Sequence, residues 1–474
     1  MKRTIRCLRP ALAVTAAALS LGGCMIGPGY ERPVSAVPAS YRAAAGWVEA
    51  QPADAIDRGA WWARFDDPVL DELAARVEIS NQNVAAATAS YAQARALVRA
   101  QRASLFPSFA LDGNANRIGT RIGGDAEASS SYRIGIGAGW EPDVWGRLQR
   151  SVESASASAQ ASAADLASAQ LSAQGEVAAN YFLLRQTDAQ IALLEETIAG
   201  YRRSLEITQN RYDVGVIART DVLQAQTQLA NTQADAVGLR LQRAQFEHAI
   251  AVLVGRSPSE FSLPAAQWNA VVPPVPIGIP STLLQRRPDI AAAERRVAAA
   301  NEQIGIAQAA FYPSFNLTGS LGLGAGSISA LASASSVLWS LGVSAAQILF
   351  DAGATRERVV IAQEVHAETV ARYRQTVLAA FQGVENLLTA TRVLEQEEVL
   401  RRQASDAAAQ VSAQVQNRYQ AGQVGYTEVV IAQATALNAR RALVRLMADR
   451  QTTAVALIQA LGGGWEGMTP SAFR

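Results

Sequence analysis

One eighteen-residue stretch occurs twice in this chain, at positions 207 residues apart. The first copy, residues 209–226, reads QNRYDVGVIARTDVLQAQ, and the second copy, residues 416–433, reads QNRYQAGQVGYTEVVIAQ. Nine of the eighteen positions are identical, among them Gly215 and Gly422. A period of about 200 residues is much longer than the repeat unit of a solenoid, so it indicates a duplicated half-protein.

The duplication extends beyond this stretch. Phe106–Phe109 (FPSF) corresponds to Tyr312–Phe315 (YPSF) at an offset of 206 residues. Two pairs of glycines lie 207 residues apart: Gly146 with Gly353, and Gly255 with Gly462. We therefore expect two structurally equivalent halves, each with the order helix, strand pair, long helix, turn, helix.

The first 23 residues have the features of an export signal. A cationic start precedes an apolar run, residues 11–21, that is too short to span a bilayer. The run ends in Leu21-Gly22-Gly23-Cys24, which resembles the bacterial lipoprotein box, where the cysteine is acylated and becomes the new N-terminus. Met25 follows in place of the Asp that holds lipoproteins at the inner membrane, which favours the outer membrane. The alternative is an ordinary signal peptide with a chance cysteine.

Charge and cysteine content exclude several classes of protein. Cys7 leaves with the signal, so no intrachain disulfide can form. Four of the 42 basic residues also leave with it, so 38 remain against 41 acidic residues, and this balance argues against a nucleic-acid partner. No later segment contains 18 consecutive apolar residues, so the sequence predicts no transmembrane helix. If the chain crosses a membrane, strands must do it.

Four segments alternate apolar and polar residues with a period of two: residues 109–116, 132–140, 314–323 and 336–344. Segments of about ten residues with one apolar and one polar face are typical of transmembrane β-barrels. Polar loops rich in Gly and Ser are predicted between them, at residues 117–131 and 324–335. The alternative is a pair of hairpins packed on a soluble core.

The remaining chain is nearly all helix, so it offers no other sheet for these hairpins to join, and an isolated hairpin is marginally stable in water. Four strands cannot close a barrel, because the smallest single-chain barrels have about eight. An open sheet edge is not tolerated in lipid. Strands that span a membrane would therefore require several chains to share one barrel.

Two long segments, residues 148–211 and 355–419, contain no proline. At 1.5 Å per residue, about 64 helical residues reach roughly 95 Å. Residues spaced alternately by three and four form a heptad seam in each segment: Ile191, Leu194, Ile198, Tyr201, Leu205, Thr208 and Tyr212 in the first, and Val370, Tyr373, Val377, Ala380, Val384, Leu387, Thr391 and Leu394 in the second. Shorter helices are predicted over residues 67–104, 220–254, 286–310 and 427–461. A conventional long coiled coil is the alternative to a curved helical wall.

Each long helix ends in one of the repeated turns. Gly215 and Gly422 permit the positive φ that a chain reversal requires. Thr220 and Thr427 are expected to be the N-caps of the helices that follow. Apolar side chains at the exposed tips favour a docking surface over a simple reversal: Val216, Ile217 and Val424.

Several motifs extend along nearly the whole mature chain: Trp61–Leu70 (WWARFDDPVL), Arg286–Ile290 (RRPDI), Phe311–Phe315 (FYPSF), Phe350–Gly353 (FDAG) and Ala460–Trp465 (ALGGGW). In this combination the chain resembles the outer-membrane factor family of tripartite efflux systems, the TolC-like channels, in its lipoprotein (NodT-type) branch. The resemblance implies a mainly α-helical, internally duplicated protomer. It would give four β-strands and long coiled-coil helices to a trimeric β-barrel and α-helical tunnel.

By the same resemblance, the two turns are the periplasmic tips. They would contact a periplasmic adaptor (membrane-fusion) protein that is joined to an inner-membrane pump of the RND type. The tip positions are Val214, Gly215, Val216, Thr220, Gly422, Gln423, Val424 and Thr427. A periplasmic gate just above the tips would be formed by Arg211, Tyr212, Arg418, Tyr419, Glu428 and Ile431.

One position departs from the family pattern. Many relatives carry an Asp just before the Ala-Gln pair of the second turn's helix, where it forms an acidic ring at the constriction. Here Ile431 precedes Ala432-Gln433, with Glu428 one turn earlier. The gate is therefore expected to be either apolar or acidic through Glu428.

The expected organisation is as follows: signal peptide 1–23, lipidated extended segment 24–66, first repeat 67–262 with a β-hairpin at 105–142, linker 263–285, second repeat 286–464 with a β-hairpin at 311–349, and C-terminal tail 465–474. The expected location is the outer membrane, with the lipid anchor on Cys24 and a large periplasmic portion.

An enzyme is the first rival interpretation. The two histidines, His248 and His366, stand on predicted helices without a paired carboxylate or cysteine motif, and no nucleotide-binding or nucleophile motif occurs. We therefore predict no catalytic residue, no metal site and no cofactor. The second rival is a lipid-anchored coiled-coil structural or adhesive protein of the envelope. It leaves the strand pairs and the apolar tips unexplained.

Overall fold

The computed structural model describes residues 25–33, 59–122, 125–273, 287–332 and 337–463 of the chain. It divides into two compact units: unit 1 comprises Met1–Val34, Ser90–Ala163 and Ala292–Arg374, and unit 2 comprises Ser35–Ala89, Ala164–Ala291 and Gln375–Arg474. The predicted signal 1–23, the lipidation site Cys24, residues 274–285 of the predicted linker and the tail 465–474 lie outside the described residues.

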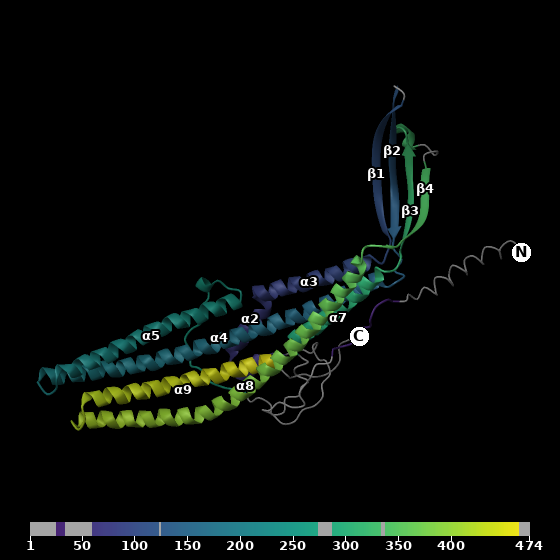
Figure 1. Cartoon of the computed structure of the whole chain (residues 1–474). Helices are drawn as coiled ribbons and strands as arrows, with labels where there is room; N and C mark the ends of the chain where they lie inside the picture. Colours follow the sequence, from purple (N-terminus) through teal and green to yellow (C-terminus); the bar gives the residue numbers. More distant parts are fainter. Residues whose placement is uncertain (1–24, 34–58, 123–124, 274–286, 333–336, 464–474) are drawn as a thin grey trace, which may run out of the picture. The chain divides into compact units, whose positions relative to one another are not determined.

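Unit 1 contains one antiparallel sheet whose strands follow the order of the chain (Figure 1). The strands are β1 (Ser108–Ile122), β2 (Asp125–Trp140), β3 (Ser314–Ala325) and β4 (Val337–Ala346). Apolar residues stand opposite each other across the strands, as in Leu111–Ile136, Ile134–Leu323 and Leu321–Trp339. Because side chains alternate along a strand, this register gathers them on one face. The four predicted strands are confirmed.

The predicted loop over residues 117–131 is wrong. β1 continues to Ile122 and β2 begins at Asp125, so that Arg117 is paired with Ser130 and Gly119 with Ala128. A β-ladder joins backbone groups and does not require apolar side chains, so the polar composition of these residues concealed the strands. The second predicted loop, 324–335, contains a 3₁₀ turn at Ser329–Ala332.

Helix α7 (Pro288–Ala309) packs in unit 1 against the first turns of α4 (Arg147–Asp213). Arg150 Nη1 donates to Glu302 Oε2 over 2.5 Å in a buried ion pair. Gln303 Nε2 donates to Ser154 Oγ over 2.9 Å. A buried ion pair needs close geometry to offset the desolvation of both charges, so it fixes the register of the two helices.

The described N-terminal segment, residues 25–33, also packs in unit 1. The Ile26 N–H donates to the Trp145 carbonyl over 3.2 Å, and Asn301 Nδ2 donates to the Pro28 carbonyl over 3.2 Å. A Cβ on Gly27 would come within 2.6 Å of Gly305 Cα, so this close approach requires a glycine at position 27. The residues that directly follow Cys24 are thus held by α7 and by the connection that precedes α4.

Unit 2 contains the largest apolar core. Trp61 and Phe65, from the 3₁₀ helix Trp61–Phe65, meet Tyr181 and Phe182 from α4. The ring centroids of Phe65 and Phe182 are 4.9 Å apart. Helices α2 (Pro68–Ser80), α5 (Arg219–Leu253) and α9 (Tyr426–Ala460) complete the core with Leu70, Leu73, Val77, Ile250, Val455 and Ile458.

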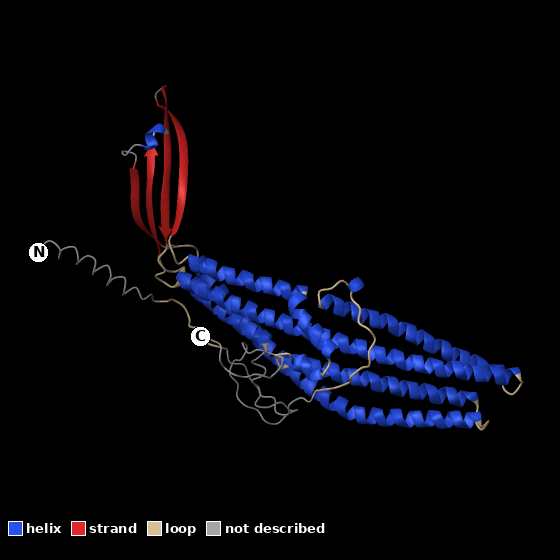
Figure 2. Cartoon of the chain, turned by 180° about the vertical axis from the view of Figure 1, so that it is seen from behind, coloured by secondary structure: helices blue, strands red, loops and turns tan. Residues whose placement is uncertain are grey.

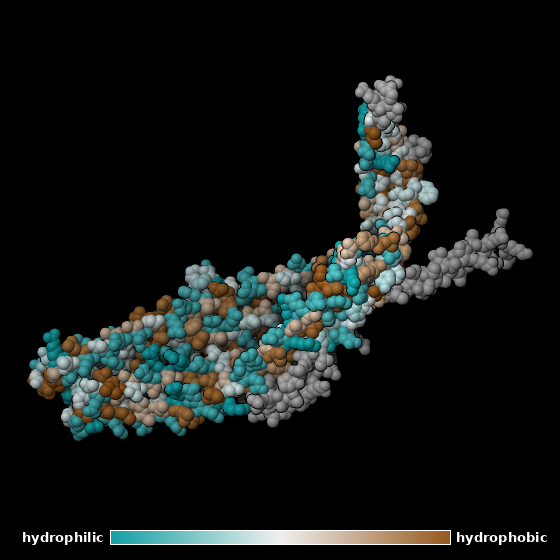
Figure 3. All heavy atoms as spheres, in the orientation of Figure 1, coloured by the Kyte–Doolittle hydropathy of each residue, from teal (hydrophilic) through white to brown (hydrophobic). Residues whose placement is uncertain are grey.

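The two long helices are confirmed, because α4 and α8 (Ala354–Gln420) have 67 residues each. In unit 2 the α4–α5 hairpin lies beside the α8–α9 hairpin (Figure 2). Leu194, Ile198 and Tyr201 of the first predicted seam are buried. Apolar and polar side chains are interspersed on the visible face of these helices (Figure 3).

The duplication is visible in the backbone. Six glycines related by the repeat have positive φ: Gly146 (75°), Gly215 (75°) and Gly255 (68°) in the first half, and Gly353 (93°), Gly422 (73°) and Gly462 (86°) in the second. Residues with a Cβ rarely adopt this conformation. Equivalent chain reversals therefore occur at equivalent positions of the two halves.

The prediction of one continuous helix over residues 67–104 is wrong, because the chain forms two helices there, α2 and α3 (Gln82–Ala103), with a break at Asn81. The buried Asn81 side chain accepts from the N–H groups of Asn83 and Val84, at 2.9 and 3.1 Å, and caps α3. Its amide donates to the Leu253 carbonyl over 2.7 Å. This long-range hydrogen bond favours the break.

Replacement of Asn81 by Ala should therefore destabilise unit 2 by about 1–3 kcal/mol, because it removes a cap and leaves the half-buried Leu253 carbonyl without its donor. The measurement is the thermal unfolding midpoint by far-ultraviolet circular dichroism. Gln82→Ala, one residue later on the exposed side of α3, is the matched control and should change stability by less than about 0.5 kcal/mol. Equal effects of the two substitutions would contradict this role of Asn81.

Candidate functional site

The repeated turns of unit 2 have the same backbone geometry. In the first, the Gly215 N–H donates to the Tyr212 carbonyl over 2.8 Å, and the Val216 N–H donates to the Arg211 carbonyl over 2.9 Å. In the second, the Gln423 N–H donates to the Arg418 carbonyl over 2.9 Å. This is the Schellman arrangement, in which a glycine with positive φ allows the last helical carbonyls to be satisfied.

The two turns present different side chains. In the first, Val214 and Val216 are 74% and 69% exposed. In the second, Gly422 and Gln423 are exposed, but Val424 packs against the cluster of Ala225, Tyr419, Tyr426 and Val429. The apolar surface predicted for both tips is therefore concentrated on the first turn.

The predicted N-caps Thr220 and Thr427 are wrong. Helix α5 begins at Arg219 after Ala218, and α9 begins at Tyr426 after Gly425. Neither capping residue has a side chain that bonds to the helix, so the helices start earlier than the threonines. Thr220 and Thr427 lie in the first turns and are exposed, and Thr427 Oγ1 donates to Gln224 Oε1 over 3.2 Å.

Arg211 connects the two hairpins. Its guanidinium donates to the carbonyls of Tyr419 and Gln420, over 3.5 and 3.3 Å, and lies 4.9 Å from the centroid of the Tyr419 ring. Of the other predicted gate residues, Tyr212, Arg418, Glu428 and Ile431 are exposed. The structure therefore brings Arg211 and Tyr419 together and places the remaining four elsewhere on the hairpins.

A tyrosine that the sequence did not single out belongs to the same contact. The Tyr419 and Tyr426 rings meet edge to face with centroids 5.5 Å apart, and the Tyr426 and Ser204 hydroxyls are 3.3 Å apart. Burial raises the pKa of Tyr426, so its phenol stays neutral at physiological pH. The residue equivalent to Tyr426 in the first repeat is Arg219, so the repeat pattern gave no signal for it.

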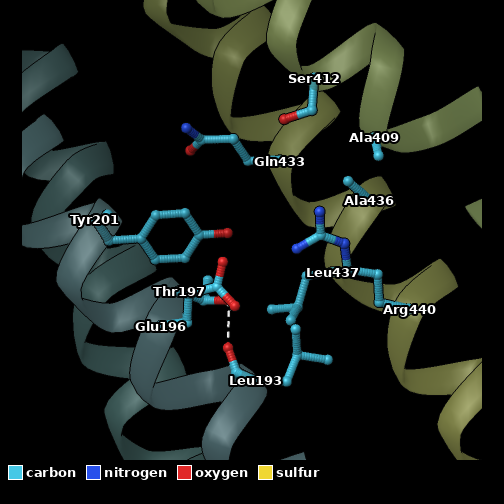
Figure 4. A pocket seen from close by; sticks show the side chains of 11 residues that line it. Leu193, Glu196, Thr197, Tyr201, Ala409, Ser412, Gln433, Ala436, Leu437 and Arg440 are labelled. Atoms are coloured by element: carbon cyan, nitrogen blue, oxygen red, sulfur yellow. Dashed lines mark hydrogen bonds between the residues drawn. The ribbon is translucent and has the colours of Figure 1, made fainter. Parts of the chain in front are cut away.

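A cavity of about 190 Å³ separates the two hairpins farther along α4 (Figure 4). Tyr201 of α4, Ser412 of α8, and Gln433 and Arg440 of α9 line it. Gln433 Oε1 is buried and has no hydrogen-bond partner among the described residues. A polar cavity of this size can hold several water molecules, which would satisfy such groups. The polar side of this cavity lies beside an apolar contact, in which Leu437 of α9 packs against the cluster of Leu194, Ile198, Ala236 and Leu239.

Among the described residues no group of three or more His, Cys, Asp or Glu side chains is arranged to hold a metal ion. None of the helices within these ranges combines the length and the apolar character required to cross a bilayer.

Comparison with known proteins identifies related chains. The sequence profile of a family described as outer membrane efflux protein matches residues 73–256 and 279–463. The toluene efflux pump outer membrane protein TtgC of Pseudomonas putida is 30% identical over 469 residues, which cover 97% of this chain and 96% of that protein. The cation efflux system protein CusC of Escherichia coli is 29% identical over 455 residues, which cover 95% and 97%. The solved outer-membrane channel OprN has a TM-score of 0.85 at 31% identity and covers 94% of this chain and 100% of that chain.

The turn geometry predicts opposite effects on stability for Gly→Ala substitutions at two positions of this hairpin. Gly215→Ala should destabilise the hairpin by about 1–2 kcal/mol, because an L-residue is strained at positive φ even though a Cβ there would meet no atom within 4 Å. Gly200→Ala, in the interior of α4 and equally open, should stabilise it by up to about 1 kcal/mol through helix propensity. Thermal unfolding midpoints measure both. A stabilising Gly215→Ala would contradict the αL assignment of this turn.

Proposed function

Because the chain belongs to the outer membrane efflux protein family, we propose that it acts as the passive homotrimeric conduit of a tripartite efflux complex. Its function in outer-membrane efflux, and its location in that membrane with a large periplasmic portion, are those of its relatives. The family consists of channel proteins and not of enzymes. The observation that carries the proposed mechanism is the contact of Arg211 with Tyr419 and Gln420, which links two helical hairpins at their ends.

Open surfaces in both units support the homotrimer. β1 and β4 are the edges of the sheet, and neither has a second partner strand among the described residues. On α5 the apolar side chains of Leu223, Val237 and Leu241 are exposed in a stripe with helical spacing, in addition to the buried seam of the same helix. Three copies would contribute twelve strands to one closed barrel, which would leave no edge in the lipid.

The repeated turns are the proposed docking site for a periplasmic adaptor protein. The first turn offers exposed Val214 and Val216 beside Gly215 and Thr220. The second offers Gly422, Gln423, Val424 and Thr427, with Val424 half-buried. Exposed apolar groups at a helical tip favour protein association, because their burial removes them from water. An inner-membrane pump of the RND type would supply the energy through this adaptor.

The gate is proposed to open when the hairpins part at these tips. Within a protomer Arg211 holds the second hairpin through two carbonyls and the Tyr419 ring. The exposed side chains of Tyr212, Arg418 and Glu428 remain available for contacts between copies. Ile431, which is also exposed, would make the constriction apolar.

The side chains at the turns and along the hairpins do not point to one class of substrate. One relative is named for toluene efflux and another for cation efflux, at 30% and 29% identity to this chain. We propose that substrates are selected upstream, and that the chain exports small molecules of diverse chemistry. The lipid anchor is proposed on Cys24, because it ends the lipoprotein-box sequence Leu21-Gly22-Gly23-Cys24.

Arg211→Ala tests the proposed gate. Both hydrogen bonds are long, and one is half-buried and the other exposed. We therefore expect them to contribute together about 1 kcal/mol of closing free energy, so that their loss increases the open probability about fivefold. Single-channel recording in planar bilayers measures it. Arg219→Ala, at an exposed arginine near the same turn, is the control and should leave the open probability unchanged. A protein that never conducts, with or without these substitutions, would favour the rival structural or adhesive role.

Ile431→Asp tests the placement of the constriction. Ile431 is exposed, so a carboxylate there avoids a large desolvation cost. In a trimer three such carboxylates would surround the axis, and we expect divalent cations to block the current at concentrations that leave the native channel open. Thr435→Asp, one turn along α9 and exposed, is the matched control. Cation block that is equal in all three proteins would exclude Ile431 from the constriction.

A further inference from the structure

A cavity of about 320 Å³ lies in unit 1 where the sheet meets the helices. Its walls come from three connections: residues 141–147 between β2 and α4, residues 309–315 between α7 and β3, and residues 346–348 at the end of β4. All three connections belong to unit 1, so one compact part of the chain bounds the cavity. A cavity of this volume is large enough for a small organic molecule or for the headgroup of a lipid.

One wall of the cavity is aromatic. The ring centroids of Trp145 and Tyr312 are 4.9 Å apart, and Trp145 Nε1 donates to the Pro313 carbonyl over 2.7 Å. Phe315 also lines the cavity, and by alternation it shares the apolar face of β3 with Leu317. Tryptophan and tyrosine are enriched at the border between hydrocarbon and water, because they combine an apolar ring with a hydrogen-bonding group.

The cavity lies at the end of the strands. β3 begins at Ser314 and β4 ends at Ala346, and both of these residues line the cavity. The strands are the part of the chain that is proposed to lie in the lipid, and the helices are the periplasmic part. The cavity is therefore expected at the level of the lipid headgroups on the periplasmic side of the membrane.

The segment that follows the proposed lipid anchor lies against the same wall. The Ile26 N–H donates to the Trp145 carbonyl over 3.2 Å. Met25 packs on the next residue, since a Cβ on Gly146 would come within 2.7 Å of Met25 Cγ. Cys24 directly precedes Met25, so acyl chains on Cys24 would enter the lipid beside this cavity. The position of the anchor thus indicates the same level as the strand ends do.

The polar side of the cavity carries an ion pair. Arg147 Nη2 donates to both carboxylate oxygens of Glu141, over 2.8 and 2.9 Å, and the two side chains are 40% and 37% exposed. Arg147 Nε and Nη1 have no hydrogen-bond partner among the described residues. An ion pair with this exposure contributes little to stability, so the requirements of folding do not explain it.

The second repeat builds the equivalent connection without this pair. At the offset of 207 residues, Ile348 and Ala354 stand in place of the glutamate and the arginine. The helix that follows is capped in both repeats, by Asp143 at the start of α4 and by Asp351 at the start of α8. Neither the turn nor the cap therefore requires the ion pair, which is specific to the connection that lines the cavity.

We propose that this cavity binds the headgroup of a phospholipid of the periplasmic leaflet, one that carries a phosphate and a primary ammonium group. The remaining N–H groups of Arg147 bind the phosphate, and Glu141 accepts hydrogen bonds from the ammonium. The acyl chains leave along Phe315 and the apolar face of β3. The charged residues of the lining are Glu141, Asp143 and Arg147, with a net charge of −1, which favours a zwitterionic headgroup over an anionic one. This inference rests on the membrane-spanning barrel proposed above and adds a bound lipid to it.

The test is native mass spectrometry of the full-length protein after incubation with an equimolar mixture of phosphatidylethanolamine and phosphatidylglycerol that have the same acyl chains. We expect one phosphatidylethanolamine to be retained per protomer, with a preference of about tenfold over phosphatidylglycerol, the effect of one charge-assisted hydrogen bond. Equal retention of the two lipids, or retention of neither, would overturn the site. Soluble phosphoethanolamine is the probe for the source of the headgroup, and its retention in place of the lipid would overturn the assignment to a phospholipid.

Substitutions separate the two ends of the headgroup. Glu141→Gln should remove the tenfold preference, because it removes the charge that faces the ammonium, whereas Arg147→Gln should lower the retention of both lipids. Arg356→Gln, at an exposed arginine in the first turn of α8 and outside the cavity, is the matched control and should retain the lipid as the native protein does. Loss of the preference in this control as well would show that the effect is not specific to the cavity.

A fourth variant leaves the ion pair intact, so that it is informative even if the pair is needed for folding. Ala310 is exposed and lines the cavity, and Ala310→Phe should fill the space and remove the bound lipid without a change of charge. Native retention in this variant would overturn the location of the site. Conductance of the same preparation in planar bilayers separates the two proposals. A protein that conducts and retains no lipid loses the headgroup site and remains a conduit, whereas a protein that never conducts counts against the conduit itself.

Discussion

The open hydrogen-bonding edges of a four-stranded sheet are the constraint on which the rest of this structure depends. A strand edge exposes unpaired N–H and C=O groups, and in hydrocarbon each unpaired group costs several kcal/mol. Among the described residues β2 pairs with β3, and the outer edges of β1 and β4 have no partner strand. If the sheet spans a membrane, these two edges must pair with strands of another chain, because an open edge is not tolerated in lipid. This constraint is the basis for the proposed homotrimer.

The two repeated turns differ in their contacts. If the repeats were identical in sequence, each turn would offer the same side chains. Arg211 contacts the second hairpin, whereas its counterpart Arg418 is exposed. The Arg211 guanidinium lies over the ring of Tyr419, which packs against the ring of Tyr426. Arg219 occupies the position equivalent to Tyr426, so the first repeat lacks this pair of aromatic rings. This single difference explains why the arginine–tyrosine contact is made by Arg211 and not by Arg418.

Much of this fold was predictable because it rests on local pattern. The period of two predicted the strands, the absence of proline predicted the long helices, and the repeated glycines predicted the turns. The break at Asn81 was not predictable, since it depends on the Leu253 carbonyl, 172 residues away. The outer halves of β1 and β2 were missed because their polar residues are paired through the backbone. At the site, the family resemblance named Arg211 and Tyr419, which the structure brings into contact, and their role in a gate stays a prediction. It did not name Tyr426 and Ser204, whose contact depends on the packing of α4 against α9.

The polar contacts in unit 2 differ within and between the two hairpins. Farther from the turns, α4 and α5 are joined by a buried network in which Asp188 pairs with Arg185 at 3.1 Å and with Arg243 at 2.6 Å. Removal of one partner from such a buried pair costs about 3–5 kcal/mol, so this network holds α4 and α5 together within the first hairpin. At the turns the two hairpins are held together by a half-buried hydrogen bond of 3.5 Å and an exposed one of 3.3 Å from Arg211. They are also joined by the buried cluster of Ala225 with Tyr419, Tyr426 and Val429. Each of these hydrogen bonds contributes on the order of 1 kcal/mol or less. An adaptor that buries the exposed Val214 and Val216 side chains, at about 1.5–3 kcal/mol for each one fully buried, would offset the loss of the Arg211 hydrogen bonds, so that the buried cluster becomes the main contact to be broken when the tips part.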